Sequence, residues 1–182
     1  MEAFLLNGGK GLRLRPLTEN IPKCMVEVCG KPIVEWQLTW LKYQGVTKAY
    51  VLIREDYYDS VKYLEDKWKE PEVEVVNVGR TRGTSETLVR GLEHHLPDDE
   101  FLACNGDIIT TIPLALFVKG FLHQWKCLAG MVLIPAQLPY GLAVYDGILI
   151  REFLEKPILR HYKINAGIYI FKPEAYRYLQ QF

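Results

Sequence analysis

The residues best suited to chemistry lie near the start of the chain. Gly8, Gly9 and Gly11 follow an apolar run, and the cations Arg13 and Lys23 come after them. Because glycine has no Cβ, main-chain N–H groups at such a turn can come close to phosphate oxygens. A glycine pair alone could equally be a tight turn without a ligand. Two nearby cations favour a clamped polyphosphate, so the stretch predicts a phosphate-binding loop.

Two familiar glycine motifs are excluded by single residues. A dinucleotide-binding GxGxxG motif would need its third glycine where Leu14 stands. A Walker A loop would need serine or threonine after Gly30 and Lys31, where Pro32 stands. Arg15 belongs to the same basic stretch, but we interpret it as an ordinary solvated surface charge. The loop is therefore of another kind.

Alternating apolar and amphipathic segments must position these residues. The pattern predicts strands over 3–6, 49–53, 73–78, 101–104 and 128–134. It predicts helices over 33–43, 57–68, 113–125, and from a cap at Thr84 or Ser85 to about His95. Strands that alternate with helices are typical of an α/β domain with a mainly parallel sheet. In such a sheet, ligands bind beyond the carboxyl ends of the strands, where both the glycine turn and Asp107 would lie.

The C-terminal third has a different pattern. Asp146 and Gly147 separate two strand-like runs, at 142–145 and 148–154, which is a strong hairpin signal. A further strand is expected over 163–171, and Pro173 is suited to the first turn of a last helix. We predict a Rossmann-like, doubly wound, mainly parallel sheet with an antiparallel β addition. No linker is evident, so residues 1–182 are assigned to one domain.

Composition narrows the function classes. Acidic and basic side chains balance at 22 each, which leaves no general field for nucleic acid or anionic membrane. Any anion site must therefore be local. No segment has the length of a transmembrane helix, and the N-terminus does not resemble a signal peptide. The four cysteines form no CxxC pair, so we expect reduced thiols in a cytoplasmic protein.

Several short motifs, in order, resemble the sugar-1-phosphate nucleotidylyltransferases, whose signature is GGxGxRLxPLT followed by PK. Residues 8–18 read GGKGLRLRPLT, and residues 22–25 read PKCM. The later motifs are GKPI at 30–33, GT at 83–84, NGD at 105–107, PYG at 139–141, EKP at 155–157 and NAGIY at 165–169. The likeness spans nearly the whole chain. Within the family, PKCM is most similar to guanylyltransferases acting on mannose- or heptose-type 1-phosphates.

The resemblance implies a Mg²⁺-dependent reaction between a nucleoside triphosphate and a sugar 1-phosphate. An oxygen of the sugar phosphate attacks the α-phosphorus, pyrophosphate leaves, and an NDP-sugar forms. Three residues are implied as catalytic. Arg13 would follow the leaving pyrophosphate, and Lys23 would lie between the two phosphates that must meet. Asp107 would hold Mg²⁺, a hard cation suited to a carboxylate plus phosphate oxygens.

The resemblance also implies two groups of binding residues. For the nucleotide they are Leu6, Gly8, Gly9, Gly11, Arg13, Gly83 and Thr84. For the sugar phosphate they are Gly141, Glu155, Lys156 and Asn165. Taken alone, Asp107 could simply make turn hydrogen bonds, and Glu155 with Lys156 could be solvated charges at a strand end.

One departure from the family bears on activity. Family members hold the metal with two aspartates, and the second lies some tens of residues after the NAGIY strand. No residue of this chain matches it, and the late Asp146 belongs to the hairpin turn. We therefore expect a form that is short at its C-terminus relative to the family.

Two alternatives to a sugar-phosphate enzyme stay open. One is a non-catalytic module that binds a nucleotide or an NDP-sugar. The other is a transferase with a non-sugar second substrate such as phosphocholine. The base, the sugar and homo-oligomer formation are also left open.

Overall fold

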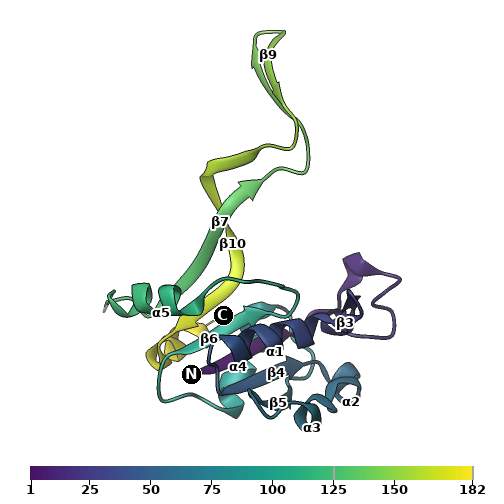
Figure 1. Ribbon diagram of the computed structural model, residues 1–182, viewed down its shortest axis with the longest axis vertical. Coiled ribbons are helices and arrows are strands. Elements are labelled where there is room, and N and C mark those ends of the chain that lie inside the picture. Colours follow the sequence, from purple (N-terminus) through teal and green to yellow (C-terminus); the bar gives the residue numbers. More distant parts are fainter. Residues whose placement is uncertain (125, 182) are drawn as a thin grey trace. The chain divides into compact units, whose positions relative to one another are not determined.

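The computed structural model describes residues 1–124 and 126–181, and a six-stranded sheet is its largest element (Figure 1). In spatial order its strands are β5 (Glu72–Asn77), β4 (Lys48–Ile53), β1 (Glu2–Asn7), β6 (Phe101–Asn105), β10 (Ile158–Phe171) and β7 (Ala129–Gln137). β5, β4, β1 and β6 pair in parallel, whereas β10 pairs antiparallel with β6. The predicted doubly wound, mainly parallel sheet with an antiparallel C-terminal addition is confirmed.

Contacts within the chain divide it into two compact units. The first comprises residues 1–130 and 167–182, and the second comprises residues 131–166. All of 131–166 is described, and none of these residues is buried. The second unit therefore has no hydrophobic core of its own. Assignment of the whole chain to one domain stays a prediction.

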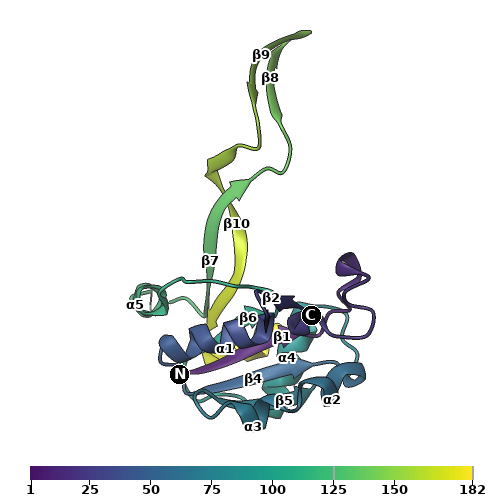
Figure 2. The same cartoon turned by 45° about the vertical axis from the view of Figure 1, so that its right-hand side comes forward.

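The core of the first unit covers both faces of the sheet. On one face, strands pack on α4 (Thr84–His94) through Phe4, Leu6, Tyr50, Leu52, Val76, Val78, Leu88, Leu92, Phe101 and Ala103. The intervening Leu5, Val51 and Leu102 are fully buried as well. Figure 2 shows α1 (Ile33–Tyr43) running along β1. Burial on both faces explains why these strands are continuous apolar runs in the sequence.

The N-terminus of α4 differs from its prediction. Neither Thr84 nor Ser85 caps the helix, and the N-cap is Gly83 in extended conformation. The carboxylate of Glu86 instead accepts the backbone N–H of Arg82 at 2.8 Å. Glu86 thus reaches back over the first turn and ties the residue before the N-cap to the helix.

The predicted helix over 57–68 is wrong as a single element. The segment forms a 3-10 turn at Glu55–Tyr57 followed by two short helices, α2 (Tyr58–Val61) and α3 (Leu64–Lys67). The hydroxyl of Ser60 donates to the carbonyl of Tyr57 at 2.6 Å, an interaction that bends helices. Val61 and Leu64, the residues that bracket the break, are both fully buried.

The remaining elements follow the sequence closely. The hairpin around Gly147 is confirmed as β8 (Leu142–Asp146) and β9 (Leu149–Leu154), both visible in Figure 2. α5 (Leu114–Leu122) occupies most of the helix predicted over 113–125, whose last residue lies outside the described residues. Pro173 opens a 3-10 turn, Pro173–Ala175, which leads into α6 (Tyr176–Leu179). The ribbon of β2 (Glu27–Val28) and β3 (Lys31–Pro32) was not predicted.

Among residues 1–124 and 126–181, no helix is long and apolar enough to cross a membrane.

Candidate functional site

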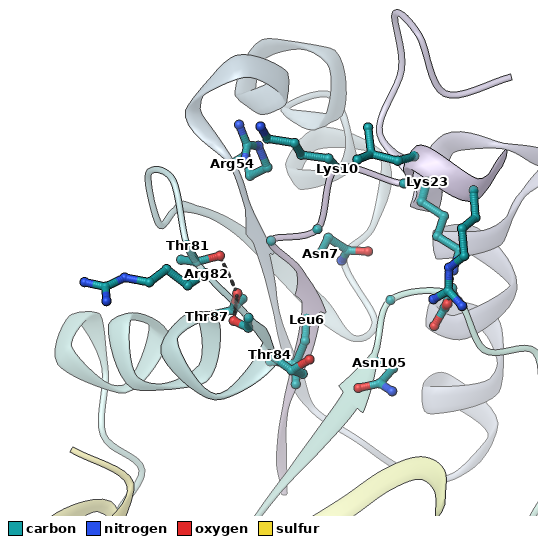
Figure 3. A pocket seen from close by; sticks show the side chains of 18 of the residues that line it. Leu6, Asn7, Lys10, Lys23, Arg54, Thr81, Arg82, Thr84, Thr87 and Asn105 are labelled. Atoms are coloured by element: carbon teal, nitrogen blue, oxygen red, sulfur yellow. Dashed lines mark hydrogen bonds and ion pairs between the residues drawn. The ribbon is translucent and has the colours of Figure 1, made fainter. Parts of the chain in front are cut away.

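A cavity of about 690 Å³ opens at the carboxyl ends of the central strands in the first unit. Figure 3 shows side chains from β1, β6 and the start of α4 around it. Nine residues with predicted roles line it: Leu6, Gly8, Gly9, Gly11, Arg13, Lys23, Gly83, Thr84 and Asp107. They come from separate stretches of the sequence, and the fold brings them to one place. Their individual binding roles stay predictions.

Strand register explains this convergence. Leu6 pairs with Asn105 across parallel strands, and the backbone N–H of Gly106 donates to the Leu6 carbonyl at 3.1 Å. The chain therefore leaves β1 and β6 side by side, with Gly8 just beyond one strand and Asp107 just beyond the other. Parallel pairing thus supplies the common edge that the sequence predicts.

The glycine turn is fitted closely to the helix behind it. A Cβ on Gly8 would overlap the hydroxyl oxygens of Thr81 and Thr87. These hydroxyls bond to each other at 2.8 Å, and the Thr87 hydroxyl also donates to the Gly83 carbonyl at 2.9 Å. Gly9, in contrast, has open space where a Cβ would be. Gly8 is therefore required for packing, while Gly9 presents bare backbone to the cavity.

The next part of the loop is held by internal hydrogen bonds. Gly11 has a φ of 65°, a conformation that favours glycine. Its carbonyl accepts the Thr18 hydroxyl at 2.7 Å and the Leu14 N–H at 2.9 Å. These bonds close a 3-10 turn over Leu12–Leu14, which carries Arg13. The predicted phosphate-binding cation thus belongs to a turn whose start is anchored by two hydrogen bonds to the Gly11 carbonyl.

Lys23 and Asp107 form an ion pair across the cavity. Lys23 opens a second 3-10 turn, Lys23–Met25, whose Cys24 is buried. Both charged side chains are about one-third exposed, at 32% and 36%. The two groups predicted to handle phosphate and metal therefore neutralise each other when no ligand separates them.

The oxygen ligands here fit a magnesium ion. Asp107 offers a carboxylate at the carboxyl end of β6, and the buried Oδ1 of Asn105 has no hydrogen-bond partner among the described residues. Both are hard oxygen donors, and Mg²⁺ commonly uses one or two carboxylates plus substrate phosphates. Within the same described residues, no group of three or more His, Cys, Asp or Glu side chains could hold a metal alone. A metal here would need oxygens from a ligand.

Several lining residues carry no predicted role. They include Lys10, Arg54, Thr81, Thr87 and Asn105. The sequence contains one sign that Arg54 could lie at the cavity. Arg54 directly follows a predicted strand, and Asp107 likewise lies shortly after β6. Thr81 and Thr87 give none, since their importance depends on how closely Gly8 approaches α4.

The predicted sugar-phosphate residues belong to the second unit. Gly141 precedes β8, and a Cβ there would overlap the ring of Phe153. Glu155 and Lys156 are exposed, with their charged atoms 3.8 Å apart, and Lys156 has a φ of 45°. Asn165 lies in β10. The roles of the four residues stay predictions.

Comparison with known proteins identifies the family. Residues 2–182 match the sequence family described as "Nucleotidyl transferase". The chain belongs to this family. It is 33% identical over 193 residues to the mannose-1-phosphate guanylyltransferase catalytic subunit beta of Danio rerio, covering 99% of this chain and 52% of that protein. It is 31% identical over 185 residues to the bifunctional protein GlmU of Methanocaldococcus jannaschii, covering 100% of this chain and 42% of that protein.

Solved structures share the fold of this chain. HddC from Yersinia pseudotuberculosis, crystallised with GMP-PN, has a TM-score of 0.71 at 22% identity, over 95% of this chain and 77% of that one. The chain spans about half the length of the mannose-1-phosphate guanylyltransferases that it matches. Membership of the family is thus established for a chain much shorter than those relatives.

Proposed function

We propose that this nucleotidyl transferase joins a nucleoside triphosphate to a sugar 1-phosphate and releases pyrophosphate. The observation that carries the proposal is the convergence of nine residues with predicted roles on one cavity. The glycine backbone supplies N–H donors and Arg13 and Lys23 supply cations for two anionic reactants, while Asp107 supplies a carboxylate for a metal ion. Such a reaction depends on positioning and on neutralising charge rather than on a covalent nucleophile.

The glycine loop, Arg13 and Lys23 have distinct parts in the proposed mechanism. Backbone N–H groups around Gly9 and Gly11 bind the triphosphate, and Arg13 stays with the pyrophosphate as it leaves. Lys23 lies between the α-phosphate and the incoming sugar phosphate, where it offsets their repulsion. To do so, its ammonium must move from Asp107 to the phosphates, which frees the carboxylate.

Asp107 would hold Mg²⁺ together with phosphate oxygens of the substrate. The metal supplies Lewis-acid polarisation of the α-phosphate and neutralises charge on the triphosphate. The unpartnered Oδ1 of Asn105 offers a second oxygen at the end of β6, two residues before Asp107. No second carboxylate is required for this arrangement, although a single one should hold the metal more weakly.

We propose GTP and mannose 1-phosphate as the first substrates to test. The names of the similar guanylyltransferases support this choice, as does the GMP-PN bound to HddC. Pyrophosphate release should be measured with Mg²⁺ over a panel of nucleoside triphosphates and sugar 1-phosphates. Release that requires both substrates is the expected result.

Two variants tie turnover to the site. Lys23→Met and Asp107→Asn should each lower kcat/KM by at least about tenfold, because each removes charge stabilisation in the transition state. Arg15→Met is the matched control, since Arg15 belongs to the same stretch but does not line the cavity. Equal losses in all three variants, or no turnover with any pair of substrates, would contradict the proposal.

A second candidate is a module that binds nucleotide without turning it over. The single carboxylate of the cavity favours it, since no cluster of metal ligands exists among the described residues. Calorimetry that finds nucleotide binding in a preparation without pyrophosphate release would support this alternative.

A further inference from the structure

Arg54 is a buried cation that the proposed mechanism leaves without a role. It directly follows β4 and lines the cavity, yet its side chain is only 5% exposed. One terminal nitrogen donates to Asp56 Oδ2 at 2.6 Å. Its buried Nε has no hydrogen-bond partner among residues 1–124 and 126–181. A buried guanidinium with an unused donor is costly unless a ligand completes its contacts.

Lys10 adds a second cation at the same end of the cavity. Figure 3 shows the Lys10 and Arg54 side chains pointing toward each other. Lys10 is exposed, lines the cavity, and makes no ion pair within the described part of the chain. Two like charges directed at one space repel each other, and an anion placed between them would reverse that repulsion.

The nearby carboxylates do not neutralise both cations. Asp56 is shared, because its Oδ1 also accepts from Arg80 at 3.4 Å. Glu55 pairs with the same Arg80 at 2.9 Å. The hydrogen bond from Arg54 is the main cause that lowers the pKa of Asp56, so this carboxylate stays ionised. Arg54 and Lys10 together still carry one more charge than Asp56 offsets.

Strand order shows which group could lie there. Asn7 pairs with Ile53, so Arg54 and Gly8 leave neighbouring strands side by side. Asp107 leaves β6, on the other side of β1. The glycine turn therefore lies between Arg54 on one side and the Lys23–Asp107 pair on the other. A triphosphate whose α-phosphate meets Lys23 would extend across the turn toward Arg54.

We infer that Lys10 and Arg54 form a further phosphoryl-binding subsite, which takes the terminal phosphate of the triphosphate and holds the pyrophosphate before release. This inference rests on the proposed function. The guanidinium of Arg54 is suited to phosphate, since its charge is permanent and its Nε donor has no partner among the described residues. Lys10 would close over the same group as a flexible point charge.

Binding measurements without sugar phosphate test the subsite. Calorimetry would compare GTP, GMP, pyrophosphate and inorganic phosphate on the whole chain with Mg²⁺. Lys10→Met and Arg54→Met should each weaken GTP and pyrophosphate by about tenfold, the value of one charge-assisted hydrogen bond, and leave GMP nearly unchanged. Arg15→Met is the control for loss of a distant charge and should change none of the affinities.

Asp56→Asn separates binding from a purely structural role. If Arg54 only anchors the loop through Asp56, this variant should weaken GTP binding as much as Arg54→Met does. If Arg54 binds phosphate, the variant removes a competing negative charge, and GTP should bind as well as before or better. Thermal unfolding checks that each variant folds. If Arg54→Met does not fold, the exposed Lys10→Met carries the test.

Three results would overturn the inference. The first is an equal loss of GTP and GMP affinity in Lys10→Met, and the second is a loss in Asp56→Asn that matches Arg54→Met. The third is inorganic phosphate bound tightly and not displaced by GTP, which would assign the subsite to a free anion. Failure of the proposed function is a separate outcome. If the two variants weaken GTP and pyrophosphate binding but not GMP binding, and the chain shows no turnover, the subsite is supported and the enzymatic proposal is refuted.

Discussion

Two adjacent glycines of the same loop have different physical roles. A Cβ on Gly8 would overlap the hydroxyls of Thr81 and Thr87, whereas a Cβ on Gly9 would meet nothing. Neither glycine has the positive φ that would by itself exclude a side chain. Gly8 thus serves the packing of the loop on α4, whereas Gly9 leaves its backbone open to the cavity.

Alanine at each position should separate these roles. Gly8→Ala should lower the free energy of unfolding by about 1–3 kcal/mol, because a methyl group must displace the bonded Thr81–Thr87 pair. Gly9→Ala should change stability by less than about 0.5 kcal/mol and still weaken nucleotide binding. Urea unfolding and GTP titration measure the two effects. Equal stability of the two variants would contradict the assignment.

Single residues differ in how far the sequence could predict them. The sequence could place Arg13 and Lys23 at the cavity because they follow a glycine turn, and Asp107 because it follows a predicted strand, while the roles proposed for them came from the family resemblance. Arg54 was missed because a cation after a strand is usually solvated, and only the structure shows that its side chain is buried. Thr87 was missed because it packs against a glycine far away in the sequence.

At the scale of elements, one buried charge fixes α3 against α1. Glu35 of α1 is only 5% exposed, and both its oxygens accept from Lys67 of α3 at 2.8 Å. The Tyr63 hydroxyl donates to the same carboxylate at 3.0 Å. A helix as short as α3 has little stability alone, so this contact supports it together with the buried Leu64.

Removing the cation should loosen this junction. Lys67→Met should lower the free energy of unfolding by about 1–3 kcal/mol, because Glu35 would stay buried with one partner. The half-exposed lysine keeps the cost below that of a fully buried pair. The double variant Glu35→Gln, Lys67→Met should be more stable than Lys67→Met alone, because the neutral glutamine amide at position 35 needs no counter-charge. Denaturant unfolding tests this order, and the reverse order would refute it.

The segment that carries α3 was the element least predictable from sequence. Apolar spacing over 57–68 fits one helix, and nothing in that pattern reports the break after Val61 or the hydrogen bond from the Ser60 hydroxyl to the Tyr57 carbonyl. The central strands were predictable to within one or two residues at each end, because strands buried on both faces appear in the sequence as continuous apolar runs. The apolar pattern of a sequence thus predicts strands that are buried on both faces, but it misses breaks that depend on local polar contacts.

At the scale of the whole molecule, the four cysteines report on global folding. Cys29 and Cys127 are exposed, whereas Cys24 and Cys104 are buried. Burial raises the pKa of both buried thiols from the ordinary 9.0 to about 12. A raised pKa keeps the thiol protonated at neutral pH, and the thiolate is the reactive form.

Native labelling should therefore stop at the two exposed thiols. Iodoacetamide at pH 8 followed by mass spectrometry should show two fast additions, and the others only in denaturant. The Cys29→Ser, Cys127→Ser variant should stay unlabelled until it unfolds. Fast labelling of that variant in native buffer would show that the buried strand β6 or the turn at Lys23–Met25 opens readily.

The second unit has a consequence for how the substrate range could change. Residues 131–166 include the predicted sugar-phosphate residues and no buried side chain. Substitutions away from a core usually change stability by less than about 0.5 kcal/mol. Under the proposed function, substitutions in this segment would change the sugar preference while the first unit keeps its folding free energy. A combinatorial library confined to residues 131–166 should contain few unfolded variants. It would therefore be a suitable starting point for directed evolution toward other sugar 1-phosphates.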